Sequence, residues 1–239
     1  MGQEQTRLNK YIAECGICSR READRLIDCG RVSVNGKTAG MGVKVSIADE
    51  VIVNGNAVRP KDTKVVLAYY KPVGVTCTEK DKFARKTIVE AVAYPVRVTY
   101  AGRLDKDSEG LMILTNDGDL INQMMRGANC HEKEYIVKVN KSITSDFIQE
   151  MQHGVYLKEL KQTTRECSVE EIGKLTFRIV LTQGLNRQIR RMCQTLGYEA
   201  KSIKRVRIMN IELGDLKNNA YRELTKTEQQ TLYEMVGRK

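Results

Sequence analysis

The sequence contains no tryptophan, only 3 prolines and 2 histidines, and no long hydrophobic run. Its longest uninterrupted apolar segment covers residues 65–70, whereas a membrane-spanning helix needs about 20 residues. We therefore expect a soluble, cytoplasmic protein without a membrane partner. Because His131 and His153 are the only histidines, the composition excludes a histidine-based catalytic triad and a multi-histidine metal centre.

Cysteine is present, but not in a pattern that suggests disulfides or metal binding. The 7 cysteines are an odd number, they are scattered along the chain, and no secretion signal precedes them. Cys15 and Cys18 form one C-x-x-C pair, yet a structural zinc site needs four ligands and no second pair has suitable spacing. We predict reduced thiols and no metal site.

Basic residues are in excess. With 239 residues the chain exceeds one typical domain of about 100 to 150 residues, which favours two domains. Lys plus Arg number 40 against 30 Asp plus Glu, and a net charge of +10 favours polyanionic partners. Most of the excess clusters between residues 185 and 210, where Glu199 is the only acid. The basic residues there are Arg187, Arg190, Arg191, Lys201, Lys204, Arg205 and Arg207.

The N-terminal part reads as a small domain of two helices and short strands. Apolar residues at helical spacing predict a first helix that ends near Gly16. Ser19 and Glu22 form a capping-box pattern at the start of a second helix. Asn-Gly pairs at 35–36 and 54–55 each follow an apolar strand pattern and predict hairpin turns.

A polar stretch after Pro60 separates this part from the rest, so we predict domains at 1–61 and 62–239. The second domain mixes strands with fewer helices, and its strand spacing favours a mixed, mainly antiparallel sheet. The fold class is therefore α+β. Strands are expected at 65–70, 111–115, 135–139 and 175–181, and helices at 119–125, 145–153, 187–196 and after Thr225. Asn186 is the expected cap of the third helix.

The first domain resembles the S4 RNA-binding module over roughly residues 6–60. The resemblance rests on Arg7-Leu8, on the segment 19–23 and on the segment 30–36. Side chains and backbone N–H groups around a helix N-terminus can converge on phosphates, although a solvated basic face is the plainer alternative. The residues expected to bind RNA here are Arg7, Lys10, Arg20, Arg21 and Arg25.

The densest chemical signal is the acidic segment 102–111, Gly-Arg-Leu-Asp-Lys-Asp-Ser-Glu-Gly-Leu. It matches the opening of an EF-hand calcium loop, but position twelve is Asn116 rather than Glu, and strand-like residues replace the flanking helices. An Asp-rich structural turn, with Asp105 paired to an arginine, is a second interpretation.

The third interpretation is a resemblance to the ordered motifs of pseudouridine synthases, specifically the small-subunit synthase A group. The motifs are 71–74 (Lys-Pro-Val-Gly), 102–105 (Gly-Arg-Leu-Asp), 133–135 (Lys-Glu-Tyr) and 186–192 (Asn-Arg-Gln-Ile-Arg-Arg-Met). Segments 131–135, 183–186 and 207–210 look most like members that act on large-subunit (23S) ribosomal RNA. With the S4-like part, the resemblance covers nearly the whole chain. It implies a pseudouridine synthase fold, no cofactor, and a structured RNA substrate, either a 23S stem-loop or also tRNA.

The same resemblance implies the catalytic residues. Asp105 would be the catalytic aspartate, Tyr135 the active-site tyrosine, and Arg190 the basic partner that holds the Asp105 carboxylate. A single carboxylate suffices chemically, because breaking the glycosidic bond builds positive charge on the sugar and no water enters the product.

Further RNA contacts are expected around this site. They are Arg103, Lys133, Arg187, Arg191, Arg205 and Arg207. Arg103 either fills the space of a flipped-out uridine or pairs with Asp107 or Glu109. Two other functions remain open: a non-catalytic RNA-binding or ribosome-assembly protein, and a hydrolase that uses Asp105 and Asp107. A protein partner cannot be inferred from the sequence.

Overall fold

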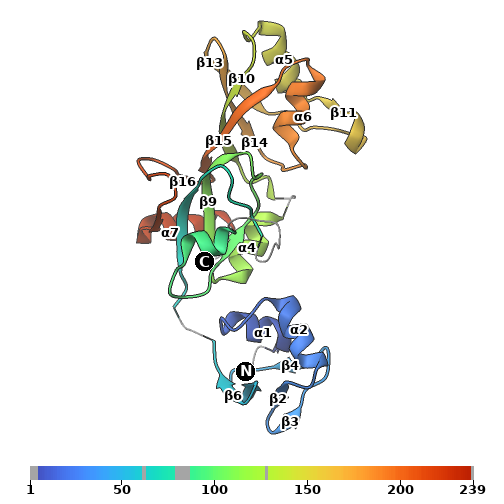
Figure 1. The fold of residues 1–239 in the computed structure, drawn as a ribbon, viewed down its shortest axis with the longest axis vertical. Helices are drawn as coiled ribbons and strands as arrows, with labels where there is room; N and C mark the ends of the chain where they lie inside the picture. The colour runs from blue at the N-terminus through green and yellow to red at the C-terminus, as the bar shows by residue number, and fades with distance from the viewer. Residues whose placement is uncertain (1–4, 61–62, 79–86, 127–128, 238–239) are drawn as a thin grey trace. The chain divides into compact units, whose positions relative to one another are not determined.

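The computed structural model describes residues 5–60, 63–78, 87–126 and 129–237, and it divides into two compact units (Figure 1). The first unit contains residues 1–65 with the short segments 94–98 and 116–118. The second contains 66–93, 99–115 and 119–239. The predicted boundary between residues 61 and 62 lies outside the described residues. Within those ranges, no helix is long and apolar enough to cross a membrane.

Two helices, α1 (Leu8–Glu14) and α2 (Arg20–Asp28), pack together in the first unit. The Ser19 hydroxyl accepts a hydrogen bond from the Glu22 N–H at 3.2 Å, which caps α2 as the sequence predicted. Leu8, Ile12 and Ile27 face a buried cluster that also takes in the strands. The helices therefore form because one apolar face of each is covered.

The strands of the first unit are short and joined by tight turns. They are β1 (Thr6–Arg7), β2 (Val32–Val34), β3 (Lys37–Thr38), β4 (Lys44–Val45), β5 (Val51–Val53) and β6 (Asn56–Val58). Four of them form a sheet of order β3-β2-β5-β6, and β1 pairs with β4. Asn35 and Asn54 have φ of 49° and 50° and each precedes a glycine with positive φ. Both predicted hairpins are thereby confirmed.

A nine-stranded sheet forms the centre of the second unit. Its strands are β7 (Val66–Lys71), β8 (Thr99–Ala101), β9 (Glu109–Thr115), β10 (Lys133–Val139), β13 (Ser168–Gly173), β14 (Thr176–Leu181), β15 (Ala200–Ile208), β16 (Ile211–Glu212) and β17 (Tyr221–Glu223). The main path runs β13-β14-β10-β15-β9-β7-β17, with β16 on β15 and β8 on β9. Among the strand pairs that the described residues form in this sheet, only that of β15 with β9 is parallel. The prediction of a mixed, mainly antiparallel sheet is confirmed.

The remaining helices pack around this sheet. They are α3 (Ile88–Val92), α4 (Gly118–Met125), α5 (Ser145–His153), α6 (Gln188–Thr195) and α7 (Lys226–Met235). Leu120 of α4 and Leu232 of α7 join Leu111 and Ile113 of β9 in one buried cluster. This cluster supports the central strands from which the site loops emerge.

One predicted helix start is wrong. The N-cap of α6 is Arg187, in a left-handed conformation with φ of 50° and without a side-chain cap bond. Asn186 instead accepts hydrogen bonds from Arg191, through its backbone oxygen at 3.0 Å and its side-chain oxygen at 3.3 Å. The left-handed conformation of Arg187 turns the chain sharply before α6. The Arg187 side chain therefore projects from this turn and not from the helix itself.

Candidate active site

The acidic segment forms a loop between β8 and β9. The Ser108 N–H donates to the Asp105 carbonyl at 3.1 Å, which closes a tight turn. Two hydrogen bonds connect this loop to the segment that follows β7. The Gly74 N–H donates to the Lys106 carbonyl at 2.8 Å, and the Leu104 N–H donates to Cys77 Sγ at 3.4 Å. The Asp105 side chain is thus presented from a fixed loop rather than from a free one.

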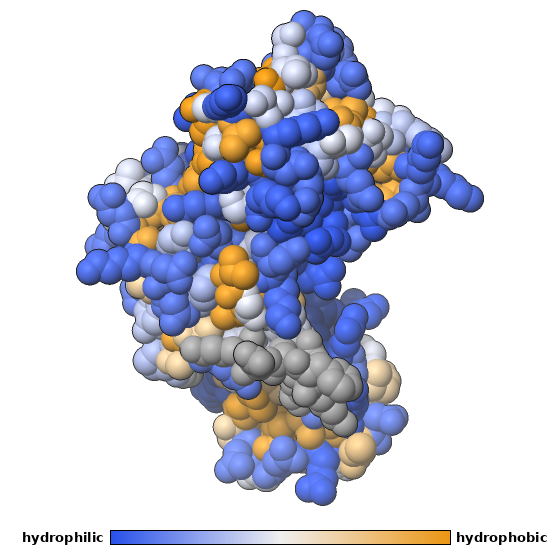
Figure 2. Space-filling model, turned by 45° about the horizontal axis from the view of Figure 1, so that its top comes forward, coloured by the Kyte–Doolittle hydropathy of each residue, from blue (hydrophilic) through white to orange (hydrophobic). Residues whose placement is uncertain are grey.

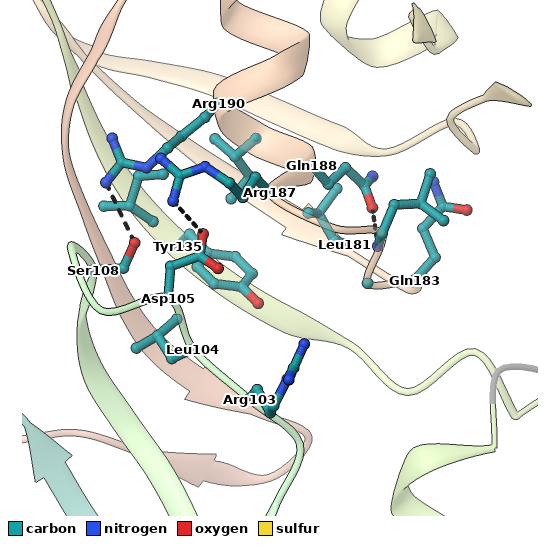
Figure 3. A pocket seen from close by; sticks show the side chains of 14 residues that line it. Arg103, Leu104, Asp105, Ser108, Tyr135, Leu181, Gln183, Arg187, Gln188 and Arg190 are labelled. Carbon is teal, nitrogen blue, oxygen red and sulfur yellow. Dashed lines mark hydrogen bonds and ion pairs between the residues drawn. The ribbon is translucent and has the colours of Figure 1, made fainter. Parts of the chain in front are cut away.

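Tyr135 comes from a different part of the sheet. It lies on β10, between β14 and β15, and its side chain is only 9% exposed. Figure 3 shows its ring beside the Asp105 carboxylate, at the floor of a cavity. Residues 30 positions apart in sequence therefore meet because the sheet brings β9 and β10 to either side of β15.

The N-terminal end of α6 contributes two arginines to the same place. Arg187 lies 3.7 Å from Asp105 Oδ2 and also donates to both carboxylate oxygens of Asp107, at 3.2 and 2.8 Å. Arg190 lies 3.3 Å from Asp107 Oδ2 and donates to the Asp107 carbonyl at 2.9 Å and to the Ser108 hydroxyl at 3.4 Å. Two cations therefore clamp the Asp105 loop against α6 (Figure 3).

This arrangement corrects one expectation. Arg190 was predicted to hold the Asp105 carboxylate, but in the structure Arg187 makes the ion pair with Asp105. Arg190 contacts the loop at Asp107 and Ser108 instead, and its Nη1 donates to the Ala200 carbonyl at 2.8 Å. The reason is geometric: Arg187 projects from the turn that precedes α6, whereas Arg190 is one turn further along the helix and reaches β15.

The cavity has the size of a single ring. Its volume is about 110 Å³, and it is open to solvent. This volume is of the same order as that of a closed cavity of about 150 Å³ that binds benzene in another protein. Its lining combines charged, aromatic and apolar side chains from the acidic loop, β10, β14, β15 and the start of α6. They include Arg103, Asp105, Tyr135, Leu181, Arg187 and Ile203. Such a cavity suits a flat, polar ligand held beside a carboxylate.

Two of the predicted RNA-binding arginines serve the protein's own fold. Arg205 is only 2% exposed, and its Nε donates to the Leu111 carbonyl at 2.7 Å, so the prediction that it contacts RNA is wrong. It lies on β15 opposite Gly110 of β9, where the two strands pair in the sheet. Arg207, two residues on, pairs with Glu132 at 3.0 Å and Glu134 at 2.9 Å. Its charge is largely neutralised within the protein.

The other predicted RNA-binding residues lie at or near the surface. Arg103 is exposed at the cavity, while the acids considered as its partners are engaged elsewhere, Asp107 with Arg187 and Glu109 with the Tyr70 hydroxyl. Lys133 is half-buried and donates to the His131 carbonyl at 3.2 Å. Arg191 pairs with Glu159.

In the first unit, α2 presents its basic residues to solvent. Arg20 and Arg21 occupy the first turn of α2 and are exposed, and Arg25 is exposed beside Glu22 at 3.1 Å. Arg7 is exposed before α1, and Lys10 pairs with Glu14 at 3.6 Å. The two helices thus carry an exposed basic surface.

The sequence reasoning assigned no role to Lys71, although the residue stands in one of the quoted motifs. Its side chain is 0% exposed, and its Nζ donates to the carbonyls of Pro72 and Val75 at 2.8 and 2.9 Å. Burial lowers the pKa of Lys71 to about 8. A lysine directly after a fully apolar strand was the available signal. It ties together the segment that braces the Asp105 loop.

Asp107 also gains a role from the structure, which a substitution tests. The hydrogen bond from Arg187 is the main cause that lowers the pKa of Asp107 below its usual 3.8. A lowered folded-state pKa contributes stability above pH 3.8, and that contribution is lost as the pH falls through the lowered value. We expect Asp107→Asn to reduce the free energy of unfolding at pH 7 by about 1 kcal/mol or less, because the carboxylate is half-exposed.

Urea titrations of both proteins from pH 7 to pH 2 measure this difference. The two proteins should converge at the acidic end, where the wild-type carboxyl is protonated as well. A difference that stays constant over the whole pH range would contradict an electrostatic clamp.

Comparisons with known proteins agree with this architecture. The family model of RNA pseudouridylate synthases matches residues 65–195, and the S4 domain model matches residues 6–52. The chain is 49% identical over 232 residues to the dual-specificity RNA pseudouridine synthase RluF of Escherichia coli (strain K12). The aligned residues cover 96% of this chain and 79% of that protein. It is 35% identical to the ribosomal large subunit pseudouridine synthase B of Bacillus subtilis (strain 168), over 93% of each chain.

A solved structure shares the fold over almost the full length. It is a crystal structure of a pseudouridylate synthase, with a TM-score of 0.70 and 27% sequence identity, covering 95% of this chain and 99% of that one. The family match includes the Asp105 loop, β10 with Tyr135, and α6 with both arginines. The chain therefore belongs to the RNA pseudouridylate synthase family and carries an S4 domain at its N-terminal end.

Proposed function

We propose that this enzyme isomerises uridine to pseudouridine in 23S ribosomal RNA and in tRNA, in the cytoplasm. The support for both RNA classes is the likeness to a dual-specificity synthase and to a large-subunit synthase. The seven cysteines are an odd number scattered along the chain, which fits a reducing compartment. We place the change from RNA-binding to catalytic domain at residues 61 and 62, between the end of β6 and the start of β7.

One observation carries the catalytic assignment: Asp105 and Tyr135 line one ring-sized cavity, and an arginine lies within 4 Å of the Asp105 carboxylate. Cleavage of the bond between N1 of uracil and C1′ of ribose builds positive charge on the sugar. An ionised carboxylate either attacks C1′ or removes the C2′ proton, and both routes begin with Asp105 deprotonated. The guanidinium of Arg187 lies 3.7 Å from this carboxylate and holds it by an ion pair.

The detached uracil must then stay bound, rotate and bond to C1′ through C5. Tyr135 is placed to stack on the ring and to help remove the proton from C5, which completes an isomerisation without a net change in atoms. Arg190 is the residue that fixes the loop, through Asp107 and Ser108. We therefore assign Asp105 and Tyr135 to the chemistry and Arg190 to the position of Asp105.

The target uridine must leave its helix to enter this cavity, because a stacked nucleotide hides its glycosidic bond. Arg103 is exposed at the cavity. It is the residue best placed to contact the RNA helix at the position that the flipped-out uridine leaves empty. The exposed arginines of α2 and Arg7 supply phosphate contacts from the S4 domain.

Pseudouridine mapping tests the proposed substrates. Total RNA from cells with and without this protein is mapped at nucleotide resolution, in 23S ribosomal RNA and in the tRNA pool. We expect at least one site in each RNA class to disappear with the protein and to return when it is resupplied. Loss of sites in only one class would reduce the proposal to that class, and no change in either would refute it.

A further inference from the structure

A second groove in the catalytic unit lies away from the Asp105 cavity. It has a volume of about 500 Å³ and lies between the C-terminal ends of α5 and α6 and the strand β11 (Tyr156–Leu157). Its lining includes Glu150, His153, Tyr156 and Lys158. None of the sequence motifs that indicated catalysis falls in this part of the chain.

The groove is built on a closed hairpin that packs against α6. Strand β11 pairs with β12 (Gln162–Thr163), and the short helix η2 (Lys158–Leu160) connects them. The hairpin closes at Gly154, whose positive φ of 95° and close approach to the Thr164 carbonyl leave no room for a Cβ atom. β11 lies beside α6 (Figure 1). Arg191 of α6 pairs with Glu159 in the connection between β11 and β12. The hairpin is thus attached to the helix that carries Arg187.

The exposed side chains of this hairpin are those that single-stranded RNA binds. Tyr156 is 52% exposed, so a base can reach it for stacking. Lys158 and Lys161, in the connection between β11 and β12, are also exposed. An aromatic platform flanked by cations is the common arrangement for stacked bases with neighbouring phosphates.

The interior of the groove favours a base over a phosphate. Most of the last carbonyl groups of α5 and α6 already accept hydrogen bonds, among them those of Gln152, Cys193 and Gln194. The Glu150 carboxylate, which lines the groove, supplies a hydrogen-bond acceptor there. Acceptors repel a phosphate but take hydrogen bonds from the amino groups of adenine, guanine or cytosine. In Figure 2 the visible face of the molecule is mostly hydrophilic, with small separate apolar patches.

We propose that this groove binds one amino-bearing base of a single-stranded nucleotide near the target uridine, stacked on Tyr156, with its phosphates at Lys158 and Lys161. This rests on the proposed function, since the RNA must be the one whose uridine enters the Asp105 cavity. Helix α6 has eight residues and is about 12 Å long, so the groove at its C-terminal end lies within a few nucleotides of Arg187 at its start.

Steady-state kinetics of the full chain test the groove, with protein-free 23S ribosomal RNA and tRNA from cells lacking this enzyme. Tyr156→Ala should raise KM about tenfold and leave kcat within about twofold, because stacking contributes to RNA binding and not to the chemistry. Tyr156→Phe keeps the ring and should behave like wild type. Tyr221→Ala removes another exposed tyrosine, on β17, and should also leave KM unchanged. An unchanged KM for Tyr156→Ala would overturn the proposal.

Direct binding separates this inference from the proposed substrates. Fluorescently labelled hexa-adenylate and an abasic hexamer with the same phosphates are titrated with wild type and with Tyr156→Ala. We expect wild type to bind hexa-adenylate more tightly than the abasic chain, and Tyr156→Ala to bind both alike. If wild type does not distinguish them, the groove does not bind a base, whether or not pseudouridine forms in the two RNA classes.

Discussion

Replacing Asp105 by asparagine should abolish pseudouridine formation while leaving the fold and the RNA affinity intact. The amide keeps the size of the side chain but cannot attack C1′, remove a proton, or carry the charge that faces Arg187 at 3.7 Å. We expect the turnover rate to fall by roughly 10⁴-fold, the scale on which loss of an essential active-site group acts. Single-turnover assays on RNA from cells that lack the enzyme measure this directly.

The matched control is Asp215→Asn, which removes the same charge at an exposed position outside the cavity lining. It should turn over RNA like wild type, whereas both variants should bind RNA and unfold at the wild-type temperature. Retention of more than about a tenth of the wild-type rate by Asp105→Asn would show that another group performs the chemistry.

Gly110→Ala should have the largest effect on stability. Gly110 has φ of 115°, and a Cβ atom there would lie 2.2 Å from the Arg205 carbonyl oxygen and 2.6 Å from the Arg205 nitrogen. Both contacts are with the backbone of β15, which cannot move aside without breaking the parallel pairing of β15 with β9. We expect a loss of at least about 3 kcal/mol in the free energy of unfolding, measured by urea titration.

Gly118→Ala provides the comparison, because Gly118 stands at the start of α4, has no positive φ, and a Cβ atom there would meet nothing within 4 Å. It should be neutral or slightly stabilising, since alanine favours a helix. If Gly110→Ala unfolds at the same urea concentration as wild type, the result would contradict the close approach of Gly110 on β9 to the Arg205 backbone on β15. The position of the Asp105 loop relative to α6 would then need revision.

Much of this protein follows from short stretches of sequence. The helix at 145–153, the cap of α2 at Ser19 and the capping box at Thr225 depend on residues within a few positions of each other. The Asn-Gly hairpins require only the positive φ that these residues adopt easily. The ordered motifs were enough to identify the family and the cavity residues Asp105 and Tyr135. Local preference and motif order determined these features.

Tertiary structure decided what depends on strands far apart in sequence. Arg205 and Arg207 look alike in sequence, but the pairing of β15 with β9 and β10 buries the first and places the second between two glutamates. Whether Arg187 or Arg190 reaches Asp105 depends on the left-handed turn before α6. The number of charged residues in a segment predicts neither effect. Burial and ion pairing depend here on contacts between residues that are more than 70 positions apart in sequence.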